Sequence, residues 1–296
     1  MAALTKSKTG EVIDIFLTPS LKDSSPFGEM AKLKAKYRKD MNSLYENDRN
    51  INALFGLAVL ADYENNYDLA LRYFKKAYVE SNKSTLAAIN YGSYLGRLDL
   101  YEEAIDVLVE AFEKSDDKEH ILGVLIKVAT EDLAFSKIEN IINKYAIKDL
   151  EPVKDLIFRH TNIENALEKF EINGDFYREM RSIHKNIFYN YFTLSTPRGI
   201  LNYDDSSRNS LYLSCGIPKE AFNILFNDSM NENEKRNKME EVIGNLNDEY
   251  QDRIINFMYS DENFGKTKIK SWLQKISFSF CITDKDEEYL GGKNVS

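Results

Sequence analysis

The sequence predicts an all-α protein: a short stack of helical repeats followed by a helical region that has no repeat. The main reason is a self-similarity at a distance of 34 residues, by which Tyr67 and Ala70 return as Tyr101 and Ala104. A period of this length is typical of a helix–turn–helix unit that packs on copies of itself to bury its apolar face. Beyond about residue 150 the period is lost, although apolar residues still recur at helical spacing.

Four segments are expected along the chain. They are an N-terminal extension at 1–26, a helical repeat domain at 27–152, a helical C-terminal region at 153–290 and a disordered tail at 291–296. The first helix of the repeat domain is predicted at 27–47, where apolar residues are spaced by three and four. Its register does not match the repeat, so we interpret this helix as a cap on the stack.

Two repeat units follow, at 51–84 and 85–118, and each places large apolar and small residues at corresponding positions of two helices. In the first unit these are Leu54, Leu57, Ala58, Ala61, Tyr67, Ala70, Phe74 and Ala77, and in the second Ala88, Tyr91, Gly92, Leu95, Tyr101, Ala104, Leu108 and Ala111. The small members of each set allow two helices to approach closely.

These positions resemble the pattern of the tetratricopeptide repeat family over residues 51–118. A third unit at 119–152 is degenerate, because Ile126 and Ile138 stand where the pattern has small residues. The resemblance implies an α-solenoid, in which the first helices of successive units line a concave groove that binds a segment of another protein. A stack needs about three units for a continuous core, so the third unit matters for stability.

The resemblance also implies which residues bind the partner, because the inward positions of the first helices can be read off the pattern. They are Asn52, Phe55, Val59, Asp62 and Tyr63 in the first unit, Leu86, Ile89, Asn90, Ser93 and Arg97 in the second, and His120, Val124 and Lys127 in the third. The expected apolar floor, exposed until a partner binds, consists of Phe55, Val59, Tyr63 and Ile89. Such a mixed surface suits an extended or helical peptide, with Asn90 binding the peptide backbone.

In the C-terminal region we expect mostly helices. They are predicted at 153–171, 174–193, 218–226, 232–246, 248–259 and 265–276. The stretch 194–210 has the proline, glycine and polar residues of a loop, whereas Phe278, Phe280 and Ile282 alternate with small or polar residues and indicate one short strand. The helix at 174–193 carries aromatic residues on more than one side, which suits either burial between two layers or a contact surface for another chain.

Composition limits the classes of function. The net charge of −9 argues against a general nucleic-acid surface, because binding to phosphates needs clustered lysine and arginine. The basic run from Lys32 to Arg38 is read as a solvated helix face. No stretch is apolar enough to span a membrane and the N-terminus lacks the apolar core of a signal peptide, so we expect a soluble, cytoplasmic protein with reduced cysteines. Self-association into a homo-oligomer is left open.

Sequence motifs for catalysis, metal binding or cofactor binding are missing, so we expect no enzyme, no metal and no cofactor. One weak alternative is the pair Arg178 and His184, whose spacing is similar to the R-x5-H motif of helical HEPN ribonucleases. In that family such a pair would stabilise and protonate the scissile phosphate.

The sequence therefore predicts a non-enzymatic, protein-binding adaptor: a chaperone or neutralising partner of bacterial type that holds a segment of another protein in the groove. Two alternatives are a ribonuclease-like C-terminal region regulated by the repeats, and a regulator that binds a signalling peptide or nucleic acid.

Overall fold

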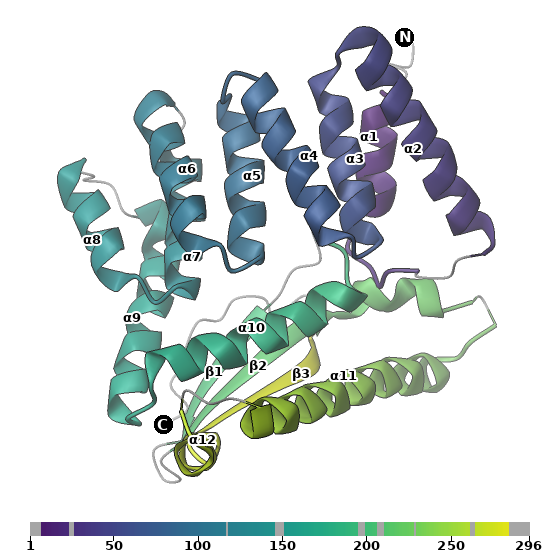
Figure 1. Ribbon diagram of the computed structural model, residues 1–296. Helices are drawn as coiled ribbons and strands as arrows, with labels where there is room; N and C mark the ends of the chain where they lie inside the picture. Colours follow the sequence, from purple (N-terminus) through teal and green to yellow (C-terminus); the bar gives the residue numbers. More distant parts are fainter. Residues whose placement is uncertain are drawn as a thin grey trace. The chain divides into compact units, whose positions relative to one another are not determined.

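The computed structural model describes residues 7–23, 27–116, 118–145, 151–194, 199–205, 210–227, 229–260 and 264–283. The chain forms two compact units, which we call unit 1 (Met1–Ala129 with Thr193–Ser195) and unit 2 (Thr130–Phe192 with Thr196–Ser296). Both are mainly helical, as predicted (Figure 1). The division falls after Ala129 rather than near residue 152, and the expected tail at 291–296 lies outside the described residues.

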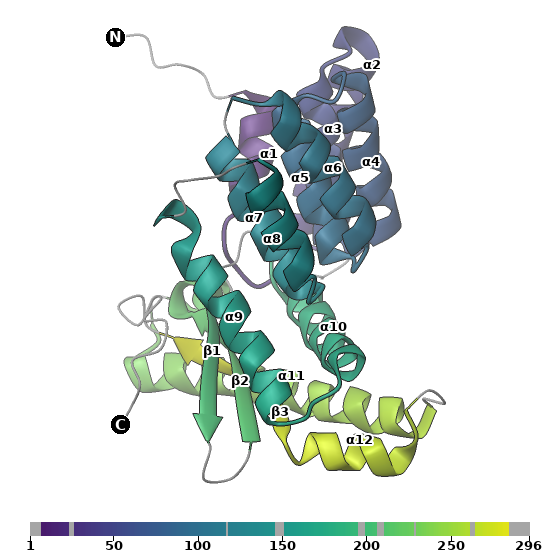
Figure 2. The same ribbon diagram turned by 90° about the vertical axis from the view of Figure 1, so that its left-hand side faces the viewer.

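The helices of unit 1 agree with those expected from the repeat, with one addition. They are α1 (Lys8–Phe16), α2 (Glu29–Asp48), α3 (Ile51–Tyr63), α4 (Tyr67–Glu80), α5 (Thr85–Arg97), α6 (Tyr101–Lys114) and α7 (Lys118–Glu131), whose last residues enter unit 2. Helix α3 packs along α4, and α5 along α6, as two hairpins (Figure 2). The addition is α1, which lies in the segment expected to be a plain extension.

The 34-residue period is present in the backbone as well as in the side chains. Asn65, Asp99 and Leu133, which follow the first helix of each unit, all have a left-handed backbone with φ of 59°, 63° and 53°. Asn and Asp adopt this conformation readily, whereas a bulky residue such as Leu133 does so only under constraint. The third unit thus keeps the turn of the first two, although its apolar residues have diverged.

Close helix contacts explain the small residues of the pattern. Ala58, Ala70 and Ala104 have no exposed surface. At Gly92 of α5, an added Cβ would lie 2.7 Å from Cγ of Leu108 in α6, well inside van der Waals contact. Glycine is therefore required there by the approach of two helices.

Unit 2 combines helices with a small sheet. Its elements are α8 (Phe135–Lys144), the 3-10 helix η1 (Glu151–Val153), α9 (Lys154–Lys169), α10 (Gly174–Tyr191), β1 (Gly199–Asp205), β2 (Ser210–Pro218), the 3-10 helix η2 (Lys219–Leu225), α11 (Glu232–Ser260), α12 (Lys266–Leu273) and β3 (Ile276–Thr283). The strand order is β1-β2-β3, with β1 antiparallel and β3 parallel to β2. In register, Leu213 pairs with Phe278 and Cys215 with Phe280, so these four residues share one face.

Several expectations for this region were wrong. The predicted loop at 194–210 contains β1, the predicted helix at 218–226 is the 3-10 helix η2, and the two helices predicted at 232–246 and 248–259 are the single helix α11. The strand expected around residues 278–282 is confirmed as β3.

Phe176 and Tyr177 of α10 are buried inside unit 2, whereas Tyr189 is half-buried and Tyr191 is 39% exposed. Phe176 lies 5.0 Å from Trp272 of α12, measured between ring centroids, and Tyr177 lies 6.0 Å from Phe278 of β3. Both are at most 1% exposed. Burial between two layers therefore explains Phe176 and Tyr177, and the contact-surface interpretation is wrong for these two rings. Among the described helices, none has the length and apolar character needed to span a membrane.

Candidate functional site

The contacts of α5 leave one side of this helix open. Gly92 faces α6, Tyr91 stacks on Tyr78 of α4 with ring centroids 5.4 Å apart, and an added Cβ at Gly96 would lie 3.0 Å from Val128 of α7. The remaining side carries exposed Leu86, half-buried Asn90 and exposed Ser93. Leu86 is the apolar residue among these three, and 61% of its surface is accessible.

Helix α7 continues this open side. His120 and Lys127 are exposed and Val124 is half-buried, at the i, i+4, i+7 spacing of one helix face. Because α6 returns the chain between them, α5 and α7 run in the same direction. On a helical wheel both open sides lie to the same side of the Gly96–Val128 contact. We call the set Leu86, Asn90, Ser93, His120, Val124 and Lys127 the α5–α7 face.

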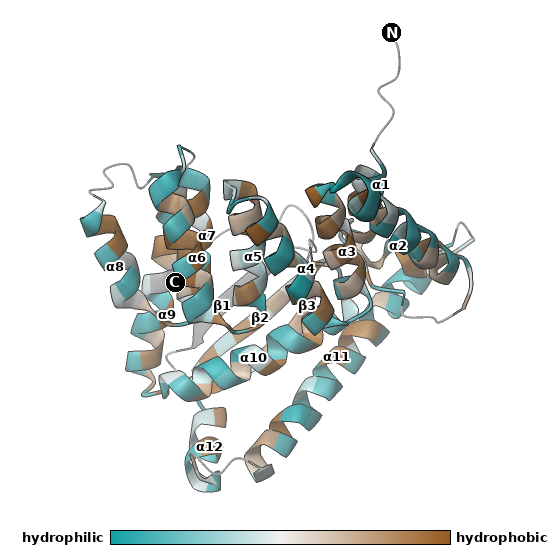
Figure 3. Ribbon diagram, turned by 45° about the horizontal axis from the view of Figure 1, so that its top comes forward, coloured by the Kyte–Doolittle hydropathy of each residue, from teal (hydrophilic) through white to brown (hydrophobic). Residues whose placement is uncertain are grey.

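The apolar floor expected at the first unit does not exist as an exposed surface. Phe55, Val59, Tyr63 and Ile89 are at most 9% exposed, so the expectation that they stay open until a partner binds was wrong. Phe55 packs on Phe74 of α4, with ring centroids 6.4 Å apart. In fact α3 is buried from Ala53 to Tyr63, whereas its N-terminal Asn52 remains exposed. Figure 3 shows the resulting contrast between hydrophobic α3 and the more hydrophilic α2.

The reason is that α1 packs on the face of α3 that corresponds to the open face of α5. Counting back 34 residues, Asn90 becomes Gly56 and Arg97 becomes Tyr63. An added Cβ at Gly56 would lie 3.7 Å from Val12 of α1 and 2.7 Å from Sδ of Met41 in α2. Phe16, at the end of α1, meets the Tyr63 ring edge-on at 5.1 Å. The first third of the predicted groove is thus occupied by α1.

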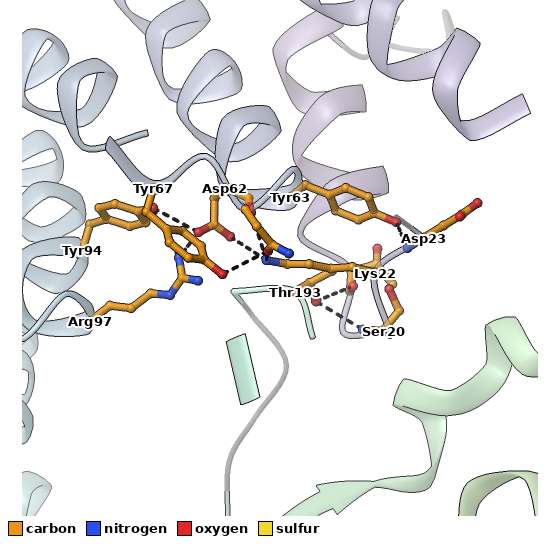
Figure 4. A network of polar contacts seen from close by, with 11 residues as sticks. Ser20, Lys22, Asp23, Asp62, Tyr63, Tyr67, Tyr94, Arg97 and Thr193 are labelled. Carbon is orange, nitrogen blue, oxygen red and sulfur yellow. Dashed lines mark hydrogen bonds and ion pairs between the residues drawn. The ribbon is translucent and has the colours of Figure 1, made fainter. Parts of the chain in front are cut away.

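A buried polar network links the C-terminal ends of α3 and α5 (Figure 4). Asp62 of α3 forms an ion pair with Arg97 of α5 and accepts a hydrogen bond of 3.0 Å from the Tyr94 hydroxyl. Lys22, from the segment after α1, donates bonds of 2.9 Å to the Asp62 carbonyl and to Oδ1 of Asn65. Asp62 and Arg97 were predicted as polar groups of an open groove, but their side chains are at most 5% exposed.

Burial dominates the electrostatics of this network. Loss of hydration, with a smaller contribution from the Arg97 charge, lowers the pKa of Lys22 to about 6. Burial likewise raises the pKa of the Tyr94 and Tyr63 hydroxyls. Because the side chains of this network bind one another and backbone atoms, we assign them a structural role.

The segment carrying Lys22 is anchored at two further points within unit 1. The backbone N–H of Asp23 donates a 2.8 Å bond to the Tyr63 hydroxyl. The Thr193 N–H donates to the Ser20 carbonyl at 3.0 Å, and the Thr193 hydroxyl to the Thr18 carbonyl at 3.0 Å. These contacts fix α1 against α3. Sequence reasoning missed them because the spacing of residues 7–23 shows no relation to the repeat.

Arg178 and His184 contact different partners in this structure. His184 is 5% exposed, its ring stacks on Phe280 at 4.0 Å, and its Nε2 lies 3.1 Å from the Ser279 carbonyl, to which only an N–H can donate. Arg178 donates to the Asp132 carbonyl at the end of α7 and pairs with Asp175. Six residues apart on a helix, the two side chains point in different directions.

Within the described residues, no cluster of three His, Cys, Asp or Glu side chains is arranged to hold a metal ion. Comparisons with protein-family models, with curated proteins and with solved structures gave no match. The interpretation of the α5–α7 face therefore depends on its own residues and on the repeat geometry.

Proposed function

We propose that the protein is a non-enzymatic adaptor of tetratricopeptide type, which holds a segment of another protein on the α5–α7 face. The observation that carries this proposal is the docking of α1 on α3. The face of α3 that α1 covers corresponds, 34 residues earlier, to the open face of α5. The chain itself thus illustrates that this side of a repeat can accept another chain segment.

The chemistry of the face indicates the kind of segment. Leu86 and Val124 offer apolar contacts, while Asn90 and Ser93 offer hydrogen-bonding groups that suit a peptide backbone. His120 and Lys127 add basic groups on the α7 side of the face. A peptide with apolar anchors and an acidic flank fits this pattern. A chaperone or a neutralising partner in a cytoplasmic, bacterial setting would use such a surface.

Site-specific photo-crosslinking in the native host tests the proposal. A photoreactive amino acid replaces Ser93 on the face, and a matched control replaces Val79 of α4, which is 60% exposed elsewhere on unit 1. We expect a discrete crosslinked partner from position 93 that is lost when Leu86→Asp is added. Equal crosslinking from position 79 would contradict an interface at this face. Crosslinking from position 93 that Leu86→Asp does not reduce would contradict it as well.

A further inference from the structure

A second surface of unit 1, on α2, is basic although the chain as a whole is acidic. Residues 32–39 carry Lys32, Lys34, Lys36, Arg38 and Lys39 and no acidic residue, within a chain whose net charge is −9. Lys32, Lys36 and Lys39 are exposed, and none of the three has an acidic partner within the described part of the chain. Their charge is therefore available to another molecule.

Beside these lysines, α2 borders a shallow hollow. It is lined by Ala31, Lys34, Ala35, Arg38, Lys39, Asn42, Ser43 and Glu46 of α2, and by Glu64 at the end of α3. The lining follows one side of α2 over four turns of helix. Its floor side chains are small at Ala31 and Ala35, so a second helix can approach the backbone closely there.

Two charges of the hollow are already used inside unit 1. Arg38 forms an ion pair with Glu64. Lys34 is 9% exposed, and its ammonium lies 5.7 Å from the Tyr63 ring centre. Lys36, beside the hollow, has its ammonium 5.3 Å from the Tyr37 ring centre. Lys39 inside the hollow and Lys32 beside it remain for a ligand, so the first half of α2 is more electropositive than its second half, which carries Glu46.

We propose that this hollow, which we call the α2 hollow, is a docking site for an acidic helix of a partner protein. Charge complementarity selects an acidic ligand, and the elongated shape with small floor residues selects a helix over an extended chain. A membrane surface fits less well, because the lining has no apolar side chain larger than alanine. Single-stranded nucleic acid fits less well too, because the lining offers no aromatic ring for base stacking.

The proposal is separate from the α5–α7 face and does not depend on it. Its test uses the full chain and a fluorescent helical peptide of alanine and glutamate, about 18 residues long so that it spans the hollow at 1.5 Å per residue. A peptide with lysine in place of glutamate, and a flexible glycine–serine peptide with the same number of glutamates, serve as ligand controls. Single-stranded RNA is the competing ligand class.

Two variants separate charge from shape. Lys32→Glu with Lys39→Glu reverses the exposed charge, and Lys75→Glu with Lys268→Glu is its matched control, because both of these lysines are exposed outside α2. Ala35→Trp fills the hollow at an exposed position without changing charge. Circular dichroism establishes that each variant is folded.

We expect the acidic helix to bind, with affinity at least tenfold lower for the α2 charge variant and for Ala35→Trp, and changed less than twofold by the control pair. Binding should weaken with salt, as for any contact made by exposed charges. Equal binding of the flexible acidic peptide, tighter binding of RNA, or unchanged affinity of Ala35→Trp would each overturn the proposal. Absence of acidic-helix binding at low salt would overturn it as well.

Discussion

The approach of α5 to α6 at Gly92 gives a quantitative test of the repeat geometry. In Gly92→Ala the new methyl would lie 2.7 Å from Cγ and 2.9 Å from Cδ2 of Leu108, which has no exposed surface and must move within a packed core. Overpacking of this kind costs about 1–3 kcal/mol. Replacing a helical glycine by alanine gains about 1 kcal/mol of helix propensity, so the net loss is about 0–2 kcal/mol.

Gly123 of α7 provides the matched control, because an added Cβ there has no atom within 4 Å. Gly123→Ala should be neutral or stabilising by up to about 1 kcal/mol. The free energies of unfolding of the two variants, measured by urea denaturation with circular dichroism, should therefore differ by about 1–3 kcal/mol, the overpacking cost alone. Equal stabilisation by both substitutions would refute the close approach of α5 and α6.

A double-mutant cycle sharpens the same test. Leu108→Ala alone opens a cavity and should cost about 2–5 kcal/mol. In the double variant with Gly92→Ala, the added methyl enters that cavity, so the two changes should couple favourably by about 0.5–3 kcal/mol. Strict additivity would mean that the two side chains do not meet.

Four other predictions concern the buried groups. Asp62→Asn should lower the free energy of unfolding by about 3–5 kcal/mol, because it leaves the buried Arg97 guanidinium without its carboxylate, and urea denaturation checks this. Because the pKa of Lys22 is about 6 in the folded state and 10.5 in the unfolded state, folding releases a proton between these pH values. The free energy of unfolding should therefore rise from about pH 7 to about pH 9, by at most about 1.4 kcal/mol per pH unit. If Lys22→Met leaves this pH dependence unchanged, it arises from another group. Phe55→Ala and Ile89→Ala should each lower the free energy of unfolding by about 2–5 kcal/mol, as expected for core residues. An unchanged melting temperature in both variants would contradict their burial. The purified protein should not cleave RNA, and His184→Ala should lower its melting temperature; cleavage that disappears in this variant would restore the ribonuclease interpretation.

The sequence was most informative where local patterns and packing agree. The helices of the first two repeats and the small residues at their contacts follow from the 34-residue period, since the same side chains meet the same neighbours in each copy. In β2, Leu211, Leu213 and Cys215 do alternate with less buried residues, so a strand signal was present but overlooked. Helix α11 continues through Asn247, the residue between the two predicted helices, because its side chain bonds the backbone of Phe280 in β3 instead of ending the helix.

The groove was harder to predict than the helices that form it. The repeat pattern identifies which side of α3 is open in an isolated stack, but it carries no information about α1, whose Val12 and Phe16 lie outside the period. Tertiary contacts of Lys22 and Thr193 with residues far along the chain then decide which part of the groove stays accessible. Apart from Asn52 at the start of α3, the part of the predicted site that remains accessible is the α5–α7 face.

The most direct test of this account is a calorimetric titration of the partner segment, once crosslinking has identified it, against two variants. Leu86→Ala removes the main exposed apolar group of the α5–α7 face, and Val79→Ala removes a side chain of similar exposure from α4. Loss of about 1.5 kcal/mol of apolar contact corresponds to a roughly tenfold weaker affinity for Leu86→Ala. If the partner segment binds the α5–α7 face, this loss is expected together with unchanged affinity for Val79→Ala. Unchanged affinity for a folded Leu86→Ala variant would contradict it.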